Sequence, residues 1–506
     1  MAKKPAEPAV KNTVAGDIAA LLAGALLPLA LAPFKLWWFA PLPLVAYLLL
    51  TRGLPLRQRY LRSLLFGLGS YGTGVSWVYV SIHDYGYLPV PVAGLITLLF
   101  VTGITLLFGI PLLLWHRWLQ DRPLGTLLGF PAAWVLAEWY RSWVLTGFPW
   151  LFLGYSQTET LAGGWAPLGG VYGLSLWLAL LAASVACWIA TRQRPWLPPL
   201  LLAVLAGGGA LLDRIEWTQP VPGRVQAAAL VQGNVPQLQK WKPEQRAAIR
   251  QLFEDLSEPL WQPGQLVVWP EAAIPELYTP DHPFFAAMDE RATASSSALV
   301  TGVPSRQVLE DGSYSYHNSL LGLGTANGFY HKQRLVPFGE YVPLQQWLEG
   351  LLDFFHMPIS EFRIGLSGQA NIETGTLQLA SSICYEVAYP ALVAEQVGDA
   401  DALLTVSNDT WFGNSIGPHQ HLQMAQMRAR ENGREMLRAT SNGISAFIDH
   451  KGGLVSRSPQ FERFVLQGTV QAYQGKTPYQ RFGDAPVLLC CVLLLLAGWR
   501  QHRAQR

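Results

Sequence analysis

Charged residues are scarce in this sequence. Asp, Glu, Lys and Arg make up 14% of its 506 residues, and 50% are hydrophobic. A soluble globular domain carries roughly 25% charged residues. The deficit excludes an ordinary soluble enzyme and predicts a membrane protein. The charges are also unevenly placed, because the region from about 222 to 480 has the composition of a water-soluble domain.

Cysteine is also rare, with four residues in the chain. Cys187, Cys490 and Cys491 fall inside apolar runs, and only Cys384 lies in the soluble-looking region. That region therefore cannot hold a disulfide framework of its own. A lone cysteine in such a place is either a small buried hydrophobe or a nucleophile.

Several signatures of ligand binding are missing. The histidines and cysteines show no metal-ligand spacing, so we expect no metal ion. No glycine-rich phosphate-binding motif is present, which argues against a nucleotide, and we expect no cofactor. The chain also lacks a polybasic tract, so we expect no nucleic-acid partner.

Long apolar runs dominate the rest of the chain. A membrane-spanning helix needs roughly 20 mostly apolar residues. Eight runs qualify as candidates, near 17–33, 37–51, 62–80, 88–115, 124–141, 168–191, 195–213 and 484–499. They predict a membrane domain of seven spans at 1–213, an outer domain at 214–483, and an eighth span with a tail at 484–506.

The basic residues of the short loops predict the orientation. They concentrate in the N-terminal tail, in the loops after spans two, four and six, and in the C-terminal tail, whereas the alternate loops hold few. Both termini are therefore predicted to face the cytoplasm, with 214–483 on the opposite side. We expect the first span to be retained rather than cleaved as a signal sequence, because its removal would break this alternation.

The outer domain has the pattern of a mixed α/β fold, in which strand-like and helical stretches alternate. The strand-like runs are 224–234, 266–269, 298–303, 319–323, 377–383 and 402–406, and the helical stretches are 243–257 and 418–438. The predicted fold is thus a polytopic helical membrane domain joined to an α/β domain.

Three short segments of the outer domain carry reactive side chains. Glu271 follows an apolar strand and a Trp-Pro pair, Lys332 precedes a Pro-Phe-Gly-Glu turn, and Cys384 lies in Cys-Tyr-Glu where a strand gives way to a turn. Taken singly, each has a structural interpretation. Glu271 can cap a helix, Lys332 can be a solvated charge, and Cys384 can be a core residue.

Taken together, these segments resemble the nitrilase superfamily of carbon–nitrogen hydrolases. The resemblance covers most of 224–460 and rests on three separated motifs in the same order. It implies a four-layer αββα sandwich. It also implies that Glu271 is the general base, that Lys332 stabilises the oxyanion, and that Cys384 attacks the carbonyl.

The chain as a whole is similar to the apolipoprotein N-acyltransferase family, in which a nitrilase-like domain precedes the last of eight spans. The family's recurring segments occur at 232–234 with Trp241, at 335–343 and 407–412, and in the membrane part at 147–150 and 154–157. The resemblance implies a multi-pass enzyme of the bacterial inner membrane, with its catalytic domain in the periplasm.

The same resemblance implies a reaction. The sn-1 acyl chain of a phospholipid passes through a thioester on Cys384 to the α-amino group of a lipoprotein's diacylglyceryl-cysteine, with ping-pong kinetics. We expect phosphatidylethanolamine as the donor, a diacylated apolipoprotein as the acceptor, and a chain that acts as a monomer.

Three residues beside the motifs are candidate supports. Glu340 is predicted to lie near Glu271 and Lys332, where it can orient the lysine. Tyr385 and Glu386 follow the nucleophile directly. A structural ion pair is the alternative role for Glu340.

Five further residues are candidate substrate contacts. Trp241 and Trp411 belong to the family's segments, and Arg141 is an ionisable residue near a membrane boundary, where charges are often functional. Snorkelling to the interface is the alternative for Arg141. Trp347 and Phe354 lie in an apolar segment at 344–357 that is either a core helix or a lid guiding acyl chains at the membrane surface.

Two other functions stay open on the sequence alone. A membrane-anchored nitrilase or amidase acting on a small amide would use the same triad, although seven preceding spans are more than an anchor needs. A transporter with an outer domain would show paired intramembrane charges or broken helices in two related halves. No such halves are evident in the sequence, and a transporter would leave the cysteine triad unexplained.

Overall fold

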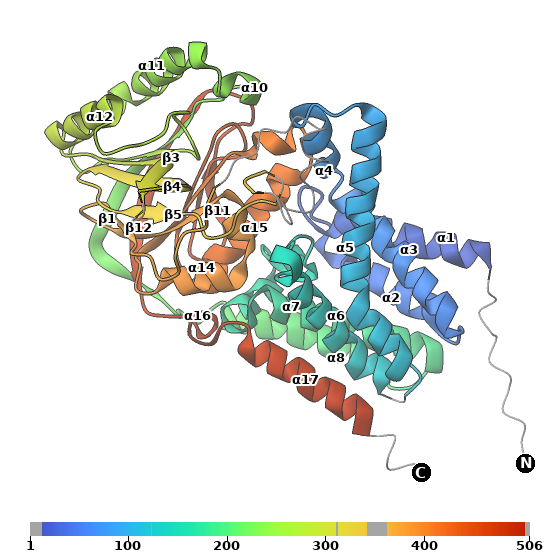
Figure 1. Cartoon of the computed structure of the whole chain (residues 1–506). Helices are drawn as coiled ribbons and strands as arrows, with labels where there is room; N and C mark the ends of the chain where they lie inside the picture. The colour runs from blue at the N-terminus through green and yellow to red at the C-terminus, as the bar shows by residue number, and fades with distance from the viewer. Residues whose placement is uncertain (1–12, 123, 310–311, 338, 342–361, 501–506) are drawn as a thin grey trace, which may run out of the picture. The chain divides into compact units, whose positions relative to one another are not determined.

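The computed structural model describes residues 13–122, 124–309, 312–337, 339–341 and 362–500. The chain divides into two compact units, shown in Figure 1. The first comprises Met1–Ser76, Pro91–Ile215 and Asp484–Arg506, and the second comprises Trp77–Val90 and Glu216–Gly483.

The described part of the first unit is helical. Its principal helices are α1 (Val14–Leu26), α2 (Pro41–Thr51), α3 (Leu56–Gly74), α5 (Val90–Trp118), α6 (Phe130–Arg141), α7 (Ala166–Thr191) and α17 (Ala485–Arg500). Shorter elements join them, namely η1 (Leu27–Ala30), η2 (Trp37–Phe39), η4 (Gly125–Gly129), η5 (Val144–Thr146), η6 (Leu153–Gln157), η7 (Leu161–Trp165), α8 (Leu197–Ala203), η8 (Val204–Gly208) and α9 (Gly209–Leu212).

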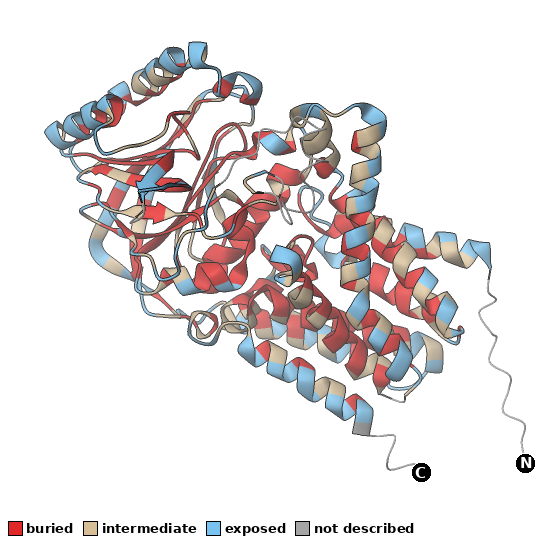
Figure 2. Ribbon diagram, in the orientation of Figure 1, coloured by how far each residue is buried: buried red, intermediate tan, exposed pale blue. Residues whose placement is uncertain are grey.

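Helices overlap all eight predicted spans. Among the described residues, two helical segments, Val90–Trp118 and Leu161–Thr191, are long and apolar enough to cross a membrane. Four shorter apolar helices are Val14–Ala30, Trp37–Thr51, Leu197–Leu212 and Ala485–Trp499. Large apolar residues of α5 and α17 are exposed, and the ribbon of both helices carries pale blue, exposed positions in Figure 2. They include Leu95, Leu98 and Leu106 on α5 and Leu489, Leu493 and Leu496 on α17. Such a surface is unfavourable in water and suits an environment of lipid acyl chains.

Small residues allow α1 and α3 to pack closely. A Cβ atom added at Gly24 would lie 1.9 Å from the Phe66 carbonyl oxygen, and one added at Gly69 would lie 2.1 Å from that of Leu21. Larger side chains at these two positions would force the helices apart. Close approach through small residues is a common mode of helix association in membranes.

The second unit contains two six-stranded sheets. The first has the order β12 (Phe464–Gln474), β1 (Gln219–Gln232), β2 (Leu266–Trp269), β3 (Ala298–Val308), β4 (Tyr314–Gly324) and β5 (Phe329–His331). The second has the order β11 (Leu454–Arg457), β10 (Ala446–Ile448), β9 (Met436–Thr440), β8 (Ala402–Ser407), β7 (Gln378–Ile383) and β6 (Ile372–Glu373). The central strands β1–β2–β3 and β7–β8–β9 run parallel.

Four layers follow from the alternation of side chains along the strands. Leu230 and Val268 of the first sheet share a core with Leu404 and Leu437 of the second, so the two sheets pack face to face. The outer face of the first sheet packs on α11 (Arg246–Ser257) and α12 (Pro283–Ala294), and that of the second on α14 (Pro390–Val397) and α15 (Gly417–Asn432). Strands buried on both faces are apolar throughout, as in the Leu-Val-Val-Trp of β2. The arrangement is the αββα sandwich that the resemblance to carbon–nitrogen hydrolases implies.

Two details differ from the sequence-based expectations. The stretch 418–438 is not one helix, because α15 ends at Asn432, Gly433 adopts a left-handed φ of 59°, and Leu437 lies in β9. The segment Trp77–Val90, expected within the membrane domain, belongs to the second unit. It contains α4 (Trp77–Val80) and η3 (Ser81–Tyr85), and the Trp77 ring packs on the Phe412 ring at 4.6 Å between centroids.

Candidate active site

The three predicted catalytic residues lie just beyond the ends of three strands. Glu271 follows β2, Lys332 follows β5, and Cys384 follows β7. Beyond the end of a strand the backbone is no longer hydrogen-bonded in the sheet, so the next side chains can point into a site at that end of the sheet. Residues from both sheets therefore meet at one end of the sandwich.

Lys332 is a buried cation at the centre of these contacts, with 1% of its side chain exposed. Its Nζ lies 2.9 Å from Oε2 of Glu340 and 3.4 Å from Oε1 of Glu271. Burial alone would lower the pKa of this amine, but Glu340 and Glu271 outweigh it and raise the pKa above its usual range. Lys332 is therefore a permanent ammonium group at neutral pH.

Glu271 accepts hydrogen bonds on both carboxylate oxygens. Asn318 Nδ2 donates to Oε1 at 2.7 Å, and the backbone N–H of Asn408 donates to Oε2 at 2.7 Å. Burial raises the pKa of Glu271, but Lys332 and these two donors together lower it below the ordinary value. The group is therefore ionised at rest and able to accept a proton.

Cys384 is half-buried in a strained backbone turn. Its φ is 53°, in the left-handed region that β-carbon-bearing residues rarely adopt. Burial and the nearby Glu271 charge raise the pKa of the thiol, and Lys332 only partly offsets them. The resting sulfur is therefore a thiol, and its proton must leave as it attacks a carbonyl.

Glu340 and Glu386 hold the segments that carry these groups. Glu340 accepts from Asn318 at 2.7 Å and from the backbone N–H of Val336 at 2.8 Å. Glu386 is fully buried and accepts from the backbone N–H groups of Gln333 at 2.5 Å and Ile383 at 2.7 Å. It thereby joins the residue after Lys332 to the residue before Cys384.

Burial raises the pKa of Glu386 to about 7, against the donors that lower it. Tyr385, the third predicted support, packs its ring against that of Tyr389 at 5.2 Å in an edge-to-face arrangement. The Tyr330 hydroxyl also donates to both oxygens of Glu386 at 3.0 Å.

Three contributors to the site were not identified from the sequence. Asn318 lies on β4 and Asn408 follows β8, and neither stands in a pattern that marks a carboxylate partner. Lys240, 3% exposed, directs its Nζ to the Glu271 carbonyl oxygen at 3.3 Å. Two signals were available in the sequence: Asn408 lies in the noted segment 407–412, and Lys240 directly precedes Trp241.

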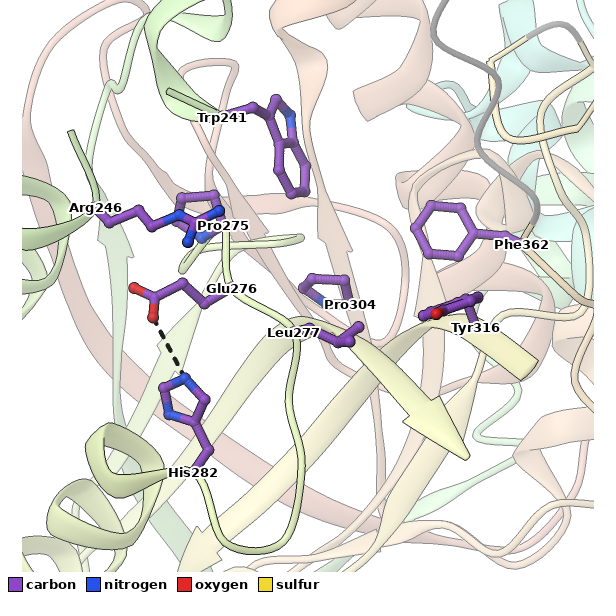
Figure 3. A pocket seen from close by; sticks show the side chains of 9 residues that line it. All are labelled: Trp241, Arg246, Pro275, Glu276, Leu277, His282, Pro304, Tyr316 and Phe362. Atoms are coloured by element: carbon purple, nitrogen blue, oxygen red, sulfur yellow. Dashed lines mark ion pairs between the residues drawn. The ribbon is translucent and has the colours of Figure 1, made fainter. Parts of the chain in front are cut away.

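The second unit holds a pocket of about 440 Å³ (Figure 3). Trp241 and Phe362 form aromatic walls, and Arg246, Glu276 and His282 lie across from them. Trp241 follows Lys240, which contacts Glu271, and the Phe362 backbone N–H donates to the Glu340 carbonyl at 3.3 Å. Backbone contacts therefore connect this pocket wall to the segments that carry Glu271 and Glu340.

Trp411 lies on the segment that follows Asn408, and 41% of it is exposed. Its carbonyl accepts a hydrogen bond from the Ser81 hydroxyl at 2.8 Å, and its ring meets the Tyr85 ring at 5.7 Å. The segment Trp77–Val90 thus packs against Trp411 within the second unit.

Arg141 lies in the first unit and is 2% exposed. Its Nη2 donates to the Trp150 carbonyl at 2.8 Å, and its guanidinium lies over the rings of Phe108 and Tyr71 at 4.9 and 5.0 Å. In this structure the Arg141 side chain contacts a backbone carbonyl and aromatic rings of the first unit. The two remaining candidates, Trp347 and Phe354, fall outside the described residues.

Comparison with known proteins places these features in a family. The profile of the apolipoprotein N-acyltransferase N-terminal domain matches residues 23–184, and that of the carbon–nitrogen hydrolases matches residues 227–479. The chain is 47% identical over 501 residues to the apolipoprotein N-acyltransferase of Azotobacter vinelandii, covering 97% of this chain and 96% of that protein. It is 46% identical to that of Pseudomonas paraeruginosa, covering 95% of each, and 38% identical to that of Vibrio vulnificus, covering 96% and 97%.

Proposed function

The chain belongs to the apolipoprotein N-acyltransferase family, and on that premise we propose that Glu271, Lys332 and Cys384 transfer an acyl chain from a phospholipid to a lipoprotein. It is a bacterial membrane enzyme with a lipid donor and a lipoprotein acceptor. The observation that carries the residue assignment is the contact of the Lys332 ammonium with Glu271 and Glu340 beside the Cys384 thiol.

The first half-reaction acylates the sulfur. Glu271 takes the thiol proton as Sγ attacks the sn-1 ester carbonyl, and Lys332 stabilises the oxygen that becomes negative. Losing one such donor costs on the order of 3 kcal/mol of barrier. The ester C–O bond then breaks, the lysophospholipid oxygen takes the proton from Glu271, and the acyl chain remains on Cys384 as a thioester.

The second half-reaction uses the same groups. The α-amino group of the diacylglyceryl-cysteine attacks the thioester, and Glu271 accepts the proton that the amine loses. The C–S bond breaks, the amide forms, and the proton returns to the sulfur. A raised thiol pKa keeps the released Cys384 protonated, which resets the site for the next donor.

We propose phosphatidylethanolamine as the preferred donor and the monomer as the active species. Arg246 in the pocket offers a positive charge to the donor phosphate, and Trp241 offers an aromatic face to the headgroup. Thioester formation from phosphatidylethanolamine and from phosphatidylglycerol vesicles, compared at equal acyl composition, tests the preference. Light scattering gives the mass of the protein in its detergent complex and tests whether the enzyme is a monomer.

We also propose eight spans, cytoplasmic termini and a periplasmic catalytic domain. Loop charges and the helices that overlap every predicted span support this topology. Alkaline phosphatase joined at residue 480 should be active, and a fluorescent protein joined at the C-terminus should fluoresce. The opposite pattern would reverse the orientation.

Intact-protein mass spectrometry tests the reaction. The purified full-length enzyme, incubated with phosphatidylethanolamine, should gain one acyl chain on Cys384 and lose it on addition of a diacylated lipopeptide, which becomes triacylated. Cys384→Ala should abolish the adduct, and Cys187→Ala, which changes a cysteine of the first unit, should preserve it. Acyl transfer by Cys384→Ala at the normal rate would refute the proposal.

A further inference from the structure

The nucleophile occupies a backbone conformation that the rest of the protein must hold in place. Cys384 has a φ of 53° at the end of β7, where the chain turns into η11 (Cys384–Ala388). Such a conformation is energetically unfavourable and persists only when surrounding contacts determine it. A buried side chain that binds this turn would fix where the sulfur points.

His421 of α15 provides such a contact. Its side chain is fully buried, and Nε2 lies 3.0 Å from the carbonyl oxygen of Cys384. On the other side of the ring, Nδ1 lies 3.0 Å from Oδ1 of Asp409 and 3.1 Å from Nη2 of Arg438. Arg438 Nη2 also donates to Oδ2 of Asp409 at 2.7 Å, and both of these side chains are fully buried.

The chemistry of the partners fixes the proton on the ring. A carbonyl oxygen can only accept, so Nε2 must carry a hydrogen and donate to Cys384. Neutral His421 then accepts from Arg438 at Nδ1, whereas a protonated ring would donate from Nδ1 to Asp409. The Nε2–H···O=C contact is present in either protonation state. Burial and the Arg438 charge lower the pKa of His421, which favours the neutral ring.

Asp409 also belongs to the segment that contacts the base. The Asn408 N–H donates to Glu271 at 2.7 Å, and the Ser407 hydroxyl donates to Oδ1 of Asp409 at 2.6 Å. One three-residue stretch therefore touches the catalytic carboxylate directly and the nucleophile through His421.

We propose that His421, clamped between Asp409 and Arg438, is a positioning residue that holds the Cys384 turn in its reactive geometry through the Nε2–H donor to the Cys384 carbonyl. A trans peptide is planar, so fixing this carbonyl also fixes the plane of the Cys384–Tyr385 peptide. The inference rests on the proposed role of Cys384 as the nucleophile. His421 itself touches neither substrate nor reacting atoms.

Two substitutions distinguish the contribution of Nε2 from that of Nδ1. In His421→Gln the side-chain amide reaches the place of Nε2 and retains a donor for Cys384. In His421→Asn the shorter amide reaches only the place of Nδ1 and loses that donor. The measured quantity is the single-turnover rate of thioester formation on Cys384 in the full-length enzyme with phosphatidylethanolamine, with the final thioester yield reporting the competent fraction.

We expect His421→Asn to lower this rate roughly ten- to hundredfold, the range that a small misplacement of a reacting group produces. The phospholipid concentration at half-maximal rate and the final thioester yield should not change. His421→Gln should recover most of the rate, and His450→Asn, at a half-buried turn whose histidine contacts Tyr473 outside the site, should leave it unchanged. Equal rates for His421→Asn and His421→Gln would overturn the proposal, whether both are normal or both are slow.

If both variants fail to fold, the proposal can still be tested by a measurement on the unmodified protein. In the ¹⁵N spectrum of histidine-labelled enzyme, Nε2 of His421 should carry hydrogen at every pH at which the protein is folded. An unprotonated Nε2 would overturn the proposal. If Cys384→Ala still transfers acyl chains while Nε2 of His421 carries hydrogen, the proposed function fails and the positioning contact survives.

Discussion

The side-chain amide of Asn318 donates a 2.7 Å hydrogen bond to the carboxylate of Glu271. Its second N–H donates at the same distance to Glu340, so one amide group holds two carboxylates on either side of the Lys332 ammonium. An –NH₂ group has two hydrogens and can serve both acceptors at once. The geometry of the proposed base depends on this residue.

Replacing Asn318 by Asp should impair the base. The substitution removes the donor and adds a third negative charge beside Glu271 and Glu340. A hydrogen bond to a charged group contributes roughly 1.5–3 kcal/mol, so acylation should slow at least about tenfold at neutral pH. The Asn318 donor lowers the pKa of Glu271, so the acidic limb of the pH–rate profile should move to higher pH. Asn371→Asp, which adds the same charge before β6, is the control, and an unmoved limb would contradict the assignment.

Glu386→Gln should loosen the link between the lysine and cysteine segments. Glu386 accepts hydrogen bonds from three backbone N–H groups and one hydroxyl. The –NH₂ group of a glutamine at this position would meet only other donors and could not accept from them. Each buried donor left unsatisfied costs about 1–3 kcal/mol. The melting temperature of the full-length protein and the rate of thioester formation should both fall. Glu395→Gln, at an exposed position on α14, should change neither.

Lys240 predicts a pH dependence of stability. Burial lowers its pKa to about 8 in the folded chain, against an ordinary value of 10.5. Between these values the unfolded chain binds more protons, so this group makes stability rise with pH. The buried charge costs about 3 kcal/mol below pH 8, and this cost disappears above 10.5.

The Lys240→Met variant tests this directly. It should melt at a higher temperature than the unmodified protein at pH 7, and the difference should shrink as the pH approaches 10. Lys242→Met, at an exposed neighbouring position, should show no such trend. A difference between Lys240→Met and the unmodified protein that stays constant from pH 7 to 10 would show that the Lys240 charge is not penalised in the fold.

Trp241→Ala should weaken donor binding rather than chemistry. The residue is 49% exposed and forms a wall of the pocket. We expect the phospholipid concentration at half-maximal acylation to rise roughly tenfold, with the maximal rate nearly unchanged, as for loss of a ground-state contact. Trp196→Ala, at an exposed tryptophan of the first unit, serves as the control. A lowered maximal rate with unchanged half-saturation would place Trp241 in the chemical step instead.

Several features follow from the sequence alone. The low charge content and the apolar runs predict the helical first unit, because apolar length is a property of contiguous residues. The runs at 266–269 and 377–383 predict strands, and both occur, with Glu271 and Cys384 placed near their ends. The order of Glu271, Lys332 and Cys384 identifies the family because each sits in a local motif.

Other features were decided by the tertiary structure. Asn318 is 47 residues from Glu271 in sequence, and Asn408 is 137 residues away, so no local pattern pairs them. The prediction of one helix over 418–438 was wrong, because α15 ends before Gly433, which adopts a left-handed conformation, and β9 follows.

Local composition determines which segments are apolar and which carry reactive groups. The partners of a buried polar group are chosen by which strands become neighbours and which faces meet. Hydrogen bonding and desolvation act over a few ångströms in space, regardless of separation along the chain. For this reason the sequence names the nucleophile, while only the fold reveals the buried His421 beneath it.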